Sequence, residues 1–97
     1  MPTFETLSRF TADLKRLSPA QRQRFRCVVL DSFVPDLRTG HFRPGLRIKR
    51  IQRAPGVYEL TWAGNGRATW SYGKEKIQST PHVIWRRIGT HDILTGP

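Results

Sequence analysis

The sequence predicts an α+β fold, in which an N-terminal helical hairpin packs on one face of a mostly antiparallel sheet of about four strands. Apolar residues recur at helical spacing in the first third of the chain. Alternating apolar and polar residues follow, and a glycine-containing turn joins two of the alternating segments. The 97 residues suffice for one domain, which we expect to span residues 1–97.

Two helices are predicted before the sheet. The first covers residues 3–17, with Thr3 as its N-cap. Its apolar stripe has spacings of three, four and three residues: Leu7, Phe10, Leu14 and Leu17. The second covers residues 19–34, because Ser18 and Gln21 form a capping-box pattern and Pro35 is expected to end the helix. Its buried face comprises Phe25, Val28, Val29 and Phe33.

The first predicted strand, Leu46–Ile51, has one apolar face and one basic face that carries Arg47 and Lys49. A β-hairpin over Val57–Tyr72 then turns at Gly64–Gly66. The expected cross-strand pairs place the large side chains on one face: Trp62–Ala68, Leu60–Trp70 and Tyr58–Tyr72.

The last strand is predicted over Val83–Ile88, with a backbone turn at Gly89. His91 and Asp92 follow at once, so this strand end presents an ionisable pair. Arg86 or Arg87 is expected to join the polar face of the sheet, and Arg87 is taken as a candidate RNA-binding residue. Taking the helices to cover the apolar face, we expect the opposite face to be basic and polar.

A formal charge of +10, from 17 Lys and Arg against 7 Asp and Glu, favours a polyanionic or acidic partner. A basic domain whose charges are only solvated is the alternative. We expect no membrane span and a cytoplasmic location, because the N-terminus lacks the apolar core of a signal peptide. The single cysteine, Cys27, lies among apolar residues and is expected to be a buried structural thiol, and no metal site or cofactor is predicted.

A basic sheet face with a histidine nearby suits binding and cleavage of RNA. Metal-free cleavage needs a base for the 2′-hydroxyl, an acid for the leaving oxygen and cations for the charge on phosphorus. Histidine transfers protons near neutral pH, and arginine matches the geometry of phosphate. The alternative is an ordinary exposed sheet face, which antiparallel sheets permit.

The order of the predicted elements resembles the RelE/ParE superfamily of bacterial toxins from type II toxin–antitoxin systems. The segments that carry the resemblance are Leu46–Lys49, Val57–Leu60, Gly66–Arg67 with Tyr72 beyond, and Ile88–Asp92. The last is similar to the Leu-Gly-Ser-His segment of YafQ-like toxins, in which the histidine belongs to the active site.

The resemblance implies a RelE-like fold and ribosome-dependent cleavage of mRNA, through metal-independent attack of the 2′-hydroxyl. His91 would be the general acid or base, Arg67 would stabilise the transition state, and Asp92 would orient the histidine or a substrate group. Arg47 and Lys49 would hold RNA phosphates. The implied partners are a cognate acidic antitoxin, the ribosome with its mRNA, and DNA indirectly through the antitoxin.

Several readings stay open at this point. Glu59 is either a general base or a solvated strand residue, because RelE itself has lysines on this strand. A ParE-like inhibitor of gyrase or a non-catalytic nucleic-acid-binding domain would share the scaffold, although His91 favours the nuclease. A helix-turn-helix DNA binder fits poorly, because the joint at Ser18 and Pro19 lacks the usual glycine turn.

Overall fold

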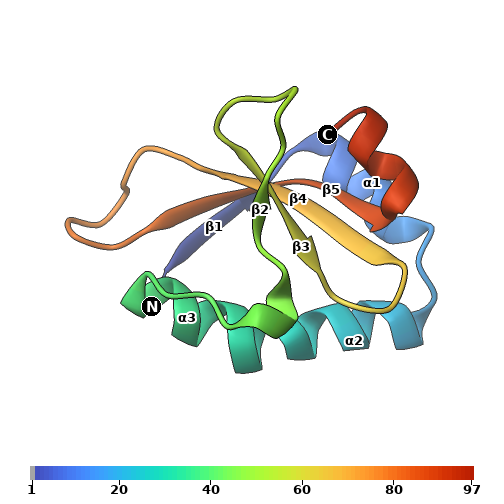
Figure 1. Ribbon diagram of the computed structural model, residues 1–97, viewed down its shortest axis with the longest axis horizontal. Helices are drawn as coiled ribbons and strands as arrows, with labels where there is room; N and C mark the ends of the chain where they lie inside the picture. Colours follow the sequence, from blue (N-terminus) through green and yellow to red (C-terminus); the bar gives the residue numbers. More distant parts are fainter. Residues whose placement is uncertain (1) are drawn as a thin grey trace.

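A five-stranded mixed sheet with helices against it forms the fold (Figure 1). The computed structural model describes residues 2–97. The strands are β1 (Thr3–Thr6), β2 (Lys49–Arg50), β3 (Val57–Thr61), β4 (Gly66–Tyr72) and β5 (His82–Thr90). Their spatial order is β1-β5-β4-β3-β2, with β1 parallel to β5 and the other neighbours antiparallel. The α+β class is confirmed, and the sheet has one strand more than the four or so expected.

The helical elements are α1 (Ser8–Lys15), α2 (Pro19–Val28), the π-helical turn η1 (Val29–Phe33) and α3 (Val34–Thr39). In Figure 1, α2 and α3 continue one another beneath the sheet, and α1 lies near β5. Two 3₁₀ turns, η2 (Pro44–Leu46) and η3 (His91–Thr95), complete the chain. The predicted capping box is confirmed, since the Ser18 N–H donates to Gln21 Oε1 at 2.8 Å and the Gln21 N–H to Ser18 Oγ at 3.1 Å.

The first predicted helix begins too early, because the chain starts with an edge strand. Thr3 lies in β1 and is not an N-cap, and its Oγ1 is 2.7 Å from Nδ1 of the buried His82. The other ring nitrogen, Nε2, is 2.6 Å from Glu5 Oε1. These contacts join two segments far apart in sequence, so pairing with β5 overrides the local helical spacing.

Pro35 does not end the second helix. At η1 the helix widens, and the Val34 N–H donates to Val29 O, five residues back. The α-helical pattern then restarts at Val34, which places Pro35 in the first turn of α3. A proline is tolerated there because the N–H that it lacks has no helical partner in a first turn.

The predicted strand over Leu46–Ile51 shrinks to the two residues of β2. Leu46 ends the turn η2 and is buried in the core, while Arg47 follows with a left-handed backbone, φ 49°. A left-handed residue interrupts an extended chain, so strand pairing begins only at Lys49.

The hairpin keeps the predicted faces, but its register differs by two residues. Leu60 lies opposite Ala68 and Tyr58 opposite Trp70, whereas the predicted partners were Trp70 and Tyr72. The tip is closed by the Trp62 N–H donating to Gly66 O at 3.1 Å. A shift of two residues preserves the side-chain alternation, so the apolar pattern could not detect it.

The strand β5 runs through Gly89, so the predicted turn at that residue is wrong. Gly89 lies opposite Arg67, and Thr90 lies opposite Gly66. The chain leaves the sheet only at His91, where η3 begins. A Cβ at position 89 would lie 3.0 Å from Ile93 Cγ2, so glycine allows η3 to pack back against the strand.

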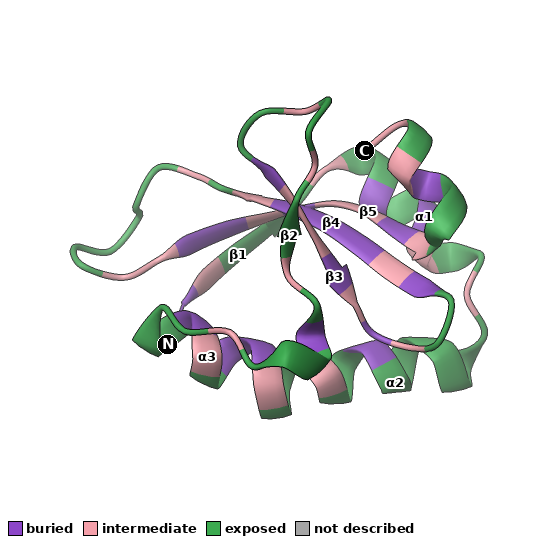
Figure 2. Cartoon of the chain, in the orientation of Figure 1, coloured by how far each residue is buried: buried purple, intermediate pink, exposed green. Residues whose placement is uncertain are grey.

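The core lies between the sheet and the continuous helical segment formed by α2, η1 and α3 (Figure 2). Phe33, Leu60 and Trp70 are among its fully buried side chains. Cys27 is exposed rather than buried, because α2 and η1 turn Phe25 and Val29 inward and leave position 27 on the outer side. None of the helices in residues 2–97 is long and apolar enough to cross a membrane.

Candidate active site

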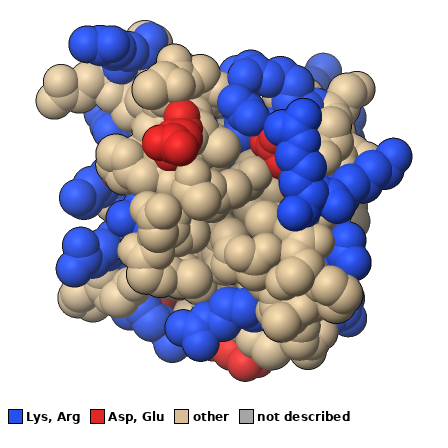
Figure 3. Space-filling model, turned by 90° about the vertical axis from the view of Figure 1, so that its right-hand side faces the viewer, with Lys and Arg blue, Asp and Glu red and all other residues tan. Residues whose placement is uncertain are grey.

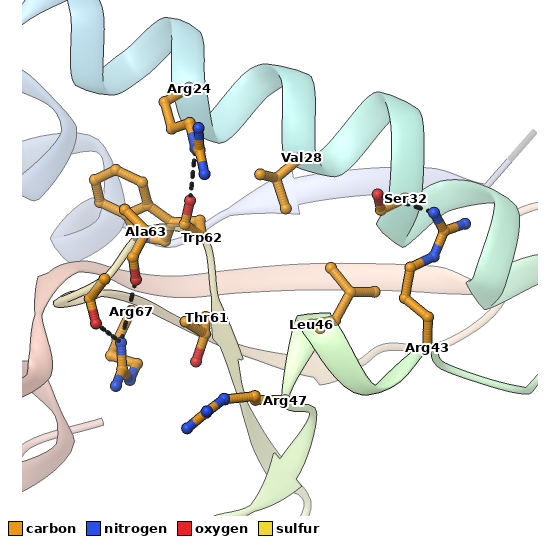
Figure 4. Close-up of a pocket in the computed structure, with 12 residues that line it drawn as sticks. Arg24, Val28, Ser32, Arg43, Leu46, Arg47, Thr61, Trp62, Ala63 and Arg67 are labelled. Carbon is orange, nitrogen blue, oxygen red and sulfur yellow. Dashed lines mark hydrogen bonds between the residues drawn. The ribbon is translucent and has the colours of Figure 1, made fainter.

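Four arginines line a cleft of about 470 Å³ between α2, the loop around η2 and the tip of the β3–β4 hairpin (Figure 4). They are Arg24, Arg43, Arg47 and Arg67, and we call this cavity the arginine cleft. Thr61 and hairpin-tip residues form another wall. Within the described chain, no carboxylate lines it. The cleft is therefore suited to a phosphate, whose oxygens accept paired hydrogen bonds from guanidinium groups.

The hairpin that contains Arg67 also holds its side chain. Nη1 donates to Gly66 O at 3.0 Å and to Gly64 O at 3.2 Å (Figure 4 shows the cluster). These bonds fix the guanidinium at the wall of the cleft. No hydrogen bond formed within residues 2–97 engages Nε or Nη2, so both nitrogens can donate to a phosphate.

The other three arginines of the cleft differ in whether a carboxylate neutralises their charge. Arg43 is paired with Asp36, with Nε–Oδ2 at 2.8 Å and Nη2–Oδ1 at 2.9 Å. Hydrogen bonds from the Arg43 side chain and backbone lower the pKa of Asp36 to about 2. Arg24 donates one hydrogen bond, from Nε to Trp62 O at 3.2 Å. Arg24, Arg47 and Arg67 therefore carry the uncompensated charge of the cleft.

His91 and Asp92 lie beside the hairpin tip but do not line the arginine cleft. Both are exposed and form the start of η3, where the Asp92 N–H donates to Thr90 Oγ1 at 3.4 Å. Because Gly89 is the strand partner of Arg67, His91 follows two residues beyond that partner. The register thus brings His91 and Arg67 to the same end of the sheet.

Glu59 and Lys49 lie further along the same polar face. They are direct strand partners across β2 and β3, and Glu59 also lies opposite Thr69 of β4. Glu59 is half-buried and two residues from Thr61, which lines the arginine cleft. In residues 2–97, no three His, Cys, Asp or Glu side chains are grouped so that they could hold a metal ion.

Arg87 faces α1 and is engaged there by Asp13. The Nε–Oδ2 and Nη2–Oδ1 distances are 2.8 and 3.0 Å, and Asp13 Oδ2 also accepts from the Ile88 N–H at 3.2 Å. Burial raises the pKa of Asp13, but these hydrogen bonds and the charges of Arg87 and Arg16 outweigh burial, so its pKa is lowered. With its charge balanced by Asp13, Arg87 holds α1 beside β5 and has no free charge to offer a phosphate.

Two residues of the cleft were not singled out from the sequence. Arg24 falls within the predicted second helix, near Arg22 and Arg26, and Arg43 falls between this helix and the first predicted strand. For Arg24, the available signal was its spacing of four residues from Val28, which places both on one face of α2. For Arg43 the sequence gives no such pattern, because the position of the loop depends on the pair with Asp36.

The fold was compared with known proteins. No protein-family model matches the chain. A search of curated protein sequences found no match either. Among solved structures, the E. coli DinJ-YafQ complex contains a chain with a TM-score of 0.62 and 15% identity, covering 99% of this chain and 100% of the other.

The same fold recurs in an E. coli YafQ with a histidine-to-glutamine mutation, at a TM-score of 0.62, 13% identity and coverage of 99% and 100%. The chain has the YafQ fold. A conserved hypothetical protein from Helicobacter pylori is similar at a TM-score of 0.54 and 16% identity, over 95% of this chain and 97% of that one. The YafQ fold was the one expected from the order of elements and the segment Ile88–Asp92.

Proposed function

We propose that the chain is the toxin of a type II toxin–antitoxin pair and cleaves mRNA in a ribosome-dependent reaction that needs no metal. The observation that carries the proposal is the arginine cleft beside His91 at one end of the sheet of a YafQ fold. The match in fold extends over the whole chain, and the solved relatives include a toxin–antitoxin complex.

The proposed reaction is attack of a ribose 2′-hydroxyl on the adjacent phosphorus. A base takes the hydroxyl proton, the new P–O bond forms, and the bond to the 5′-oxygen breaks as an acid supplies a proton to that oxygen. The products are a 2′,3′-cyclic phosphate and a 5′-hydroxyl. Charge that builds up on the phosphoryl oxygens is stabilised by cations already in place, so no reorganisation is needed during the step.

Each proposed role follows from position. Arg67 stabilises the charge on phosphorus through Nε and Nη2, because Nη1 is held by the hairpin tip. Arg47 and Arg24 bind the flanking phosphates, and Lys49 extends this basic surface along β2. His91 transfers one proton, with Asp92 beside it.

Glu59 is the candidate for the second proton transfer. It is the only carboxylate in the described strands β2, β3 and β4, and it shares a face with Thr61 and Arg67. A carboxylate and an imidazole at the two sides of a phosphate supply the base and the acid that the reaction requires. The RNA backbone would then extend along the polar face of the sheet from Glu59 to His91.

We infer that the proposed antitoxin docks on an apolar groove between α1 and α2. The groove includes Phe4 and Leu30, which are 37% and 44% exposed, and Arg22 and Arg26 also line it. Large exposed apolar side chains mark interaction surfaces, and arginines favour an acidic partner. The partner of this chemistry is an acidic helix with an apolar stripe, which would be part of the antitoxin.

Growth inhibition tests the nuclease. Expression of the chain without an antitoxin should stop growth, and His91→Ala should relieve it, because loss of general acid–base catalysis costs roughly 10²–10⁴-fold in rate. His41→Ala, at an exposed loop histidine, is the matched control and should remain toxic. If a folded His91→Ala protein stays fully toxic, a non-catalytic mechanism such as gyrase inhibition replaces the nuclease.

A further inference from the structure

A second cavity adjoins the arginine cleft at the hairpin tip. It has a volume of about 330 Å³ and lies between the α1–α2 connection, the hairpin tip and the end of β5. Its lining is mostly apolar, with Leu17, Ala20 and Trp62 among the contributors. The arginine cleft shares Arg24, Trp62 and Ala63 with it. We call it the tip cavity.

The tip cavity is also next to His91. Gly89 and Thr90, the last residues of β5, form part of its wall, and His91 follows Thr90 directly. The cavity is therefore bordered by the cationic cleft on one side and by the proposed proton-transfer residue on another. A group bound in it would be attached close to a phosphate held by Arg67.

Hydrogen-bonding groups surround this apolar space. Asn65 and Gln21, which carry amide side chains, are among its lining residues, and within residues 2–97 the one hydrogen bond to either amide is accepted by Gln21 Oε1 in the capping box. The Trp62 indole is 4% exposed, and its Nε1–H finds no acceptor in the described chain. Trp62 lines the cavity, so a ligand bound there would lie against this residue.

Trp70 is a second tryptophan with an unpaired indole N–H, and it can be compared with Trp62. Trp70 also has a buried Nε1–H without an acceptor in residues 2–97, but it lies in the core and lines neither the tip cavity nor the arginine cleft. Of these two buried indoles, Trp62 is the one that lines both cavities. Gly66 packs against this ring, since a Cβ there would lie 2.6 Å from Trp62 Cε2.

We propose that the tip cavity binds one nucleobase of single-stranded RNA, next to the phosphate held in the arginine cleft. A base is a flat, largely apolar ring with hydrogen-bonding edges, which matches an apolar cavity rimmed by amides. On the face shown in Figure 3, Lys and Arg side chains outnumber Asp and Glu around a broad uncharged area, which suits a ligand that joins an uncharged ring to phosphates. The inference rests on the proposed RNA substrate and assigns base selection to this cavity.

The test compares a labelled tetranucleotide RNA with the same RNA lacking one base, at low salt and with the full chain. Fluorescence anisotropy should show that removal of the base weakens binding to the wild type by roughly tenfold, the effect of one stacked base. Ala20→Phe fills the tip cavity from α2 and should reduce this ratio to near one, with binding of the abasic RNA within twofold of wild type. Gln23→Phe places the same ring on α2 outside the cavity and should keep the tenfold ratio.

The outcomes separate the two proposals. An unchanged ratio in a folded Ala20→Phe protein overturns the base site, whatever the protein does to RNA. Failure of Arg67→Ala to weaken binding of the abasic RNA contradicts the phosphate-binding role instead. In NMR spectra, the Trp62 indole N–H signal should shift with the complete RNA and not with the abasic one. A shift in neither case also overturns the base site.

Discussion

Gly66 is required in the hairpin because its neighbour leaves no room for a side chain. Gly66 ends the hairpin turn, where its N–H donates to Ala63 O at 3.1 Å, but its φ is not positive, so the turn does not require glycine for a left-handed backbone. Its lack of a side chain instead makes room for the Trp62 ring, at 2.6 Å from a hypothetical Cβ. The same packing holds Trp62 between the two cavities.

Gly66→Ala should therefore destabilise the protein by about 1–3 kcal/mol, because the added methyl group would overlap a buried ring. Gly64→Ala is the matched control in the same hairpin tip. A Cβ at position 64 meets nothing within 4 Å, so this variant should lie within about 0.5 kcal/mol of wild type. Urea denaturation measures both, and equal stability of the two variants would contradict this packing.

Arg67 has a structural as well as a proposed chemical role. Arg67→Lys keeps a positive charge that can reach the hairpin carbonyls but loses the planar fork that matches phosphate. We expect the free energy of unfolding to change by no more than about 1 kcal/mol. Cleavage should fall by roughly 10²-fold. A lysine variant that cleaves RNA normally would show that any cation suffices at this position.

At the scale of elements, α1 is held beside β5 by one carboxylate. Asp13 accepts hydrogen bonds from the Arg87 side chain and from the Ile88 N–H. Without Asp13, this N–H would be unpaired, because β1 pairs with β5 only as far as Trp85. Asp13→Asn should cost roughly 2–3 kcal/mol, since it leaves a partly buried guanidinium without its counterion. The exposed Asp31 provides the control as Asp31→Asn, which should be close to neutral.

The pH dependence of this contact has a defined sign. Because the pKa of Asp13 is lowered in the folded state, its contribution is complete above the ordinary value of 3.8 and is lost as the pH falls through the lower folded pKa. Asp36, with a pKa of about 2, acts in the same direction. Acid unfolding of Asp13→Asn should therefore be less steep below about pH 4 than that of wild type. An identical slope would mean that Asp13 is not charged in the fold.

The elements also show what sequence patterns can predict. The start of α2 and the faces of the hairpin were predictable because they depend on local capping and on alternation. The strand β1 was not, because its partner β5 is some eighty residues away and its contact with His82 leaves no local pattern. The spacing of apolar residues did not predict η1 either. A π-helical turn changes which carbonyl each N–H bonds to, and this change leaves no mark in the composition of the segment.

Some residues of the candidate site could be predicted from the sequence, and others could not. His91, Arg67 and Arg47 were predicted from a family resemblance, and the fold brings the strand partner of Arg67 within two residues of His91. Arg24 and Arg43 were missed because only tertiary structure brings α2 and the η2 loop to the hairpin tip. Arg87 was expected on the RNA-binding face, but the Asp13 that neutralises it lies in a helix distant in sequence.

At the scale of the whole molecule, the proposed partners use different surfaces. RNA would occupy the arginine cleft at the hairpin tip, and the antitoxin helix would occupy the apolar groove between α1 and α2. The formal charge of +10 would attract both proposed partners, since RNA and an acidic antitoxin are anionic. Binding of the antitoxin is therefore expected to depend on apolar contacts that RNA does not use.

Leu30→Glu should weaken binding of the cognate antitoxin by at least tenfold, because it places a like charge against an acidic helix in an apolar groove. The matched control is Ile77→Glu, at another exposed apolar residue, 56% exposed, that lies outside this groove. Calorimetry with the two purified proteins measures both affinities. Equal affinities for the two variants would place the antitoxin elsewhere on the surface.

The central claim is that His91 and Arg67 together cleave RNA at one end of the sheet. The most direct measurement is to incubate programmed ribosomes with the purified protein and to determine the chemical ends of the mRNA fragments. Wild type should produce 2′,3′-cyclic phosphate and 5′-hydroxyl ends, and His91→Ala and Arg67→Lys should each reduce their yield by about 10²-fold or more. Intact mRNA with wild type, or unchanged cleavage by a folded His91→Ala protein, would contradict the account.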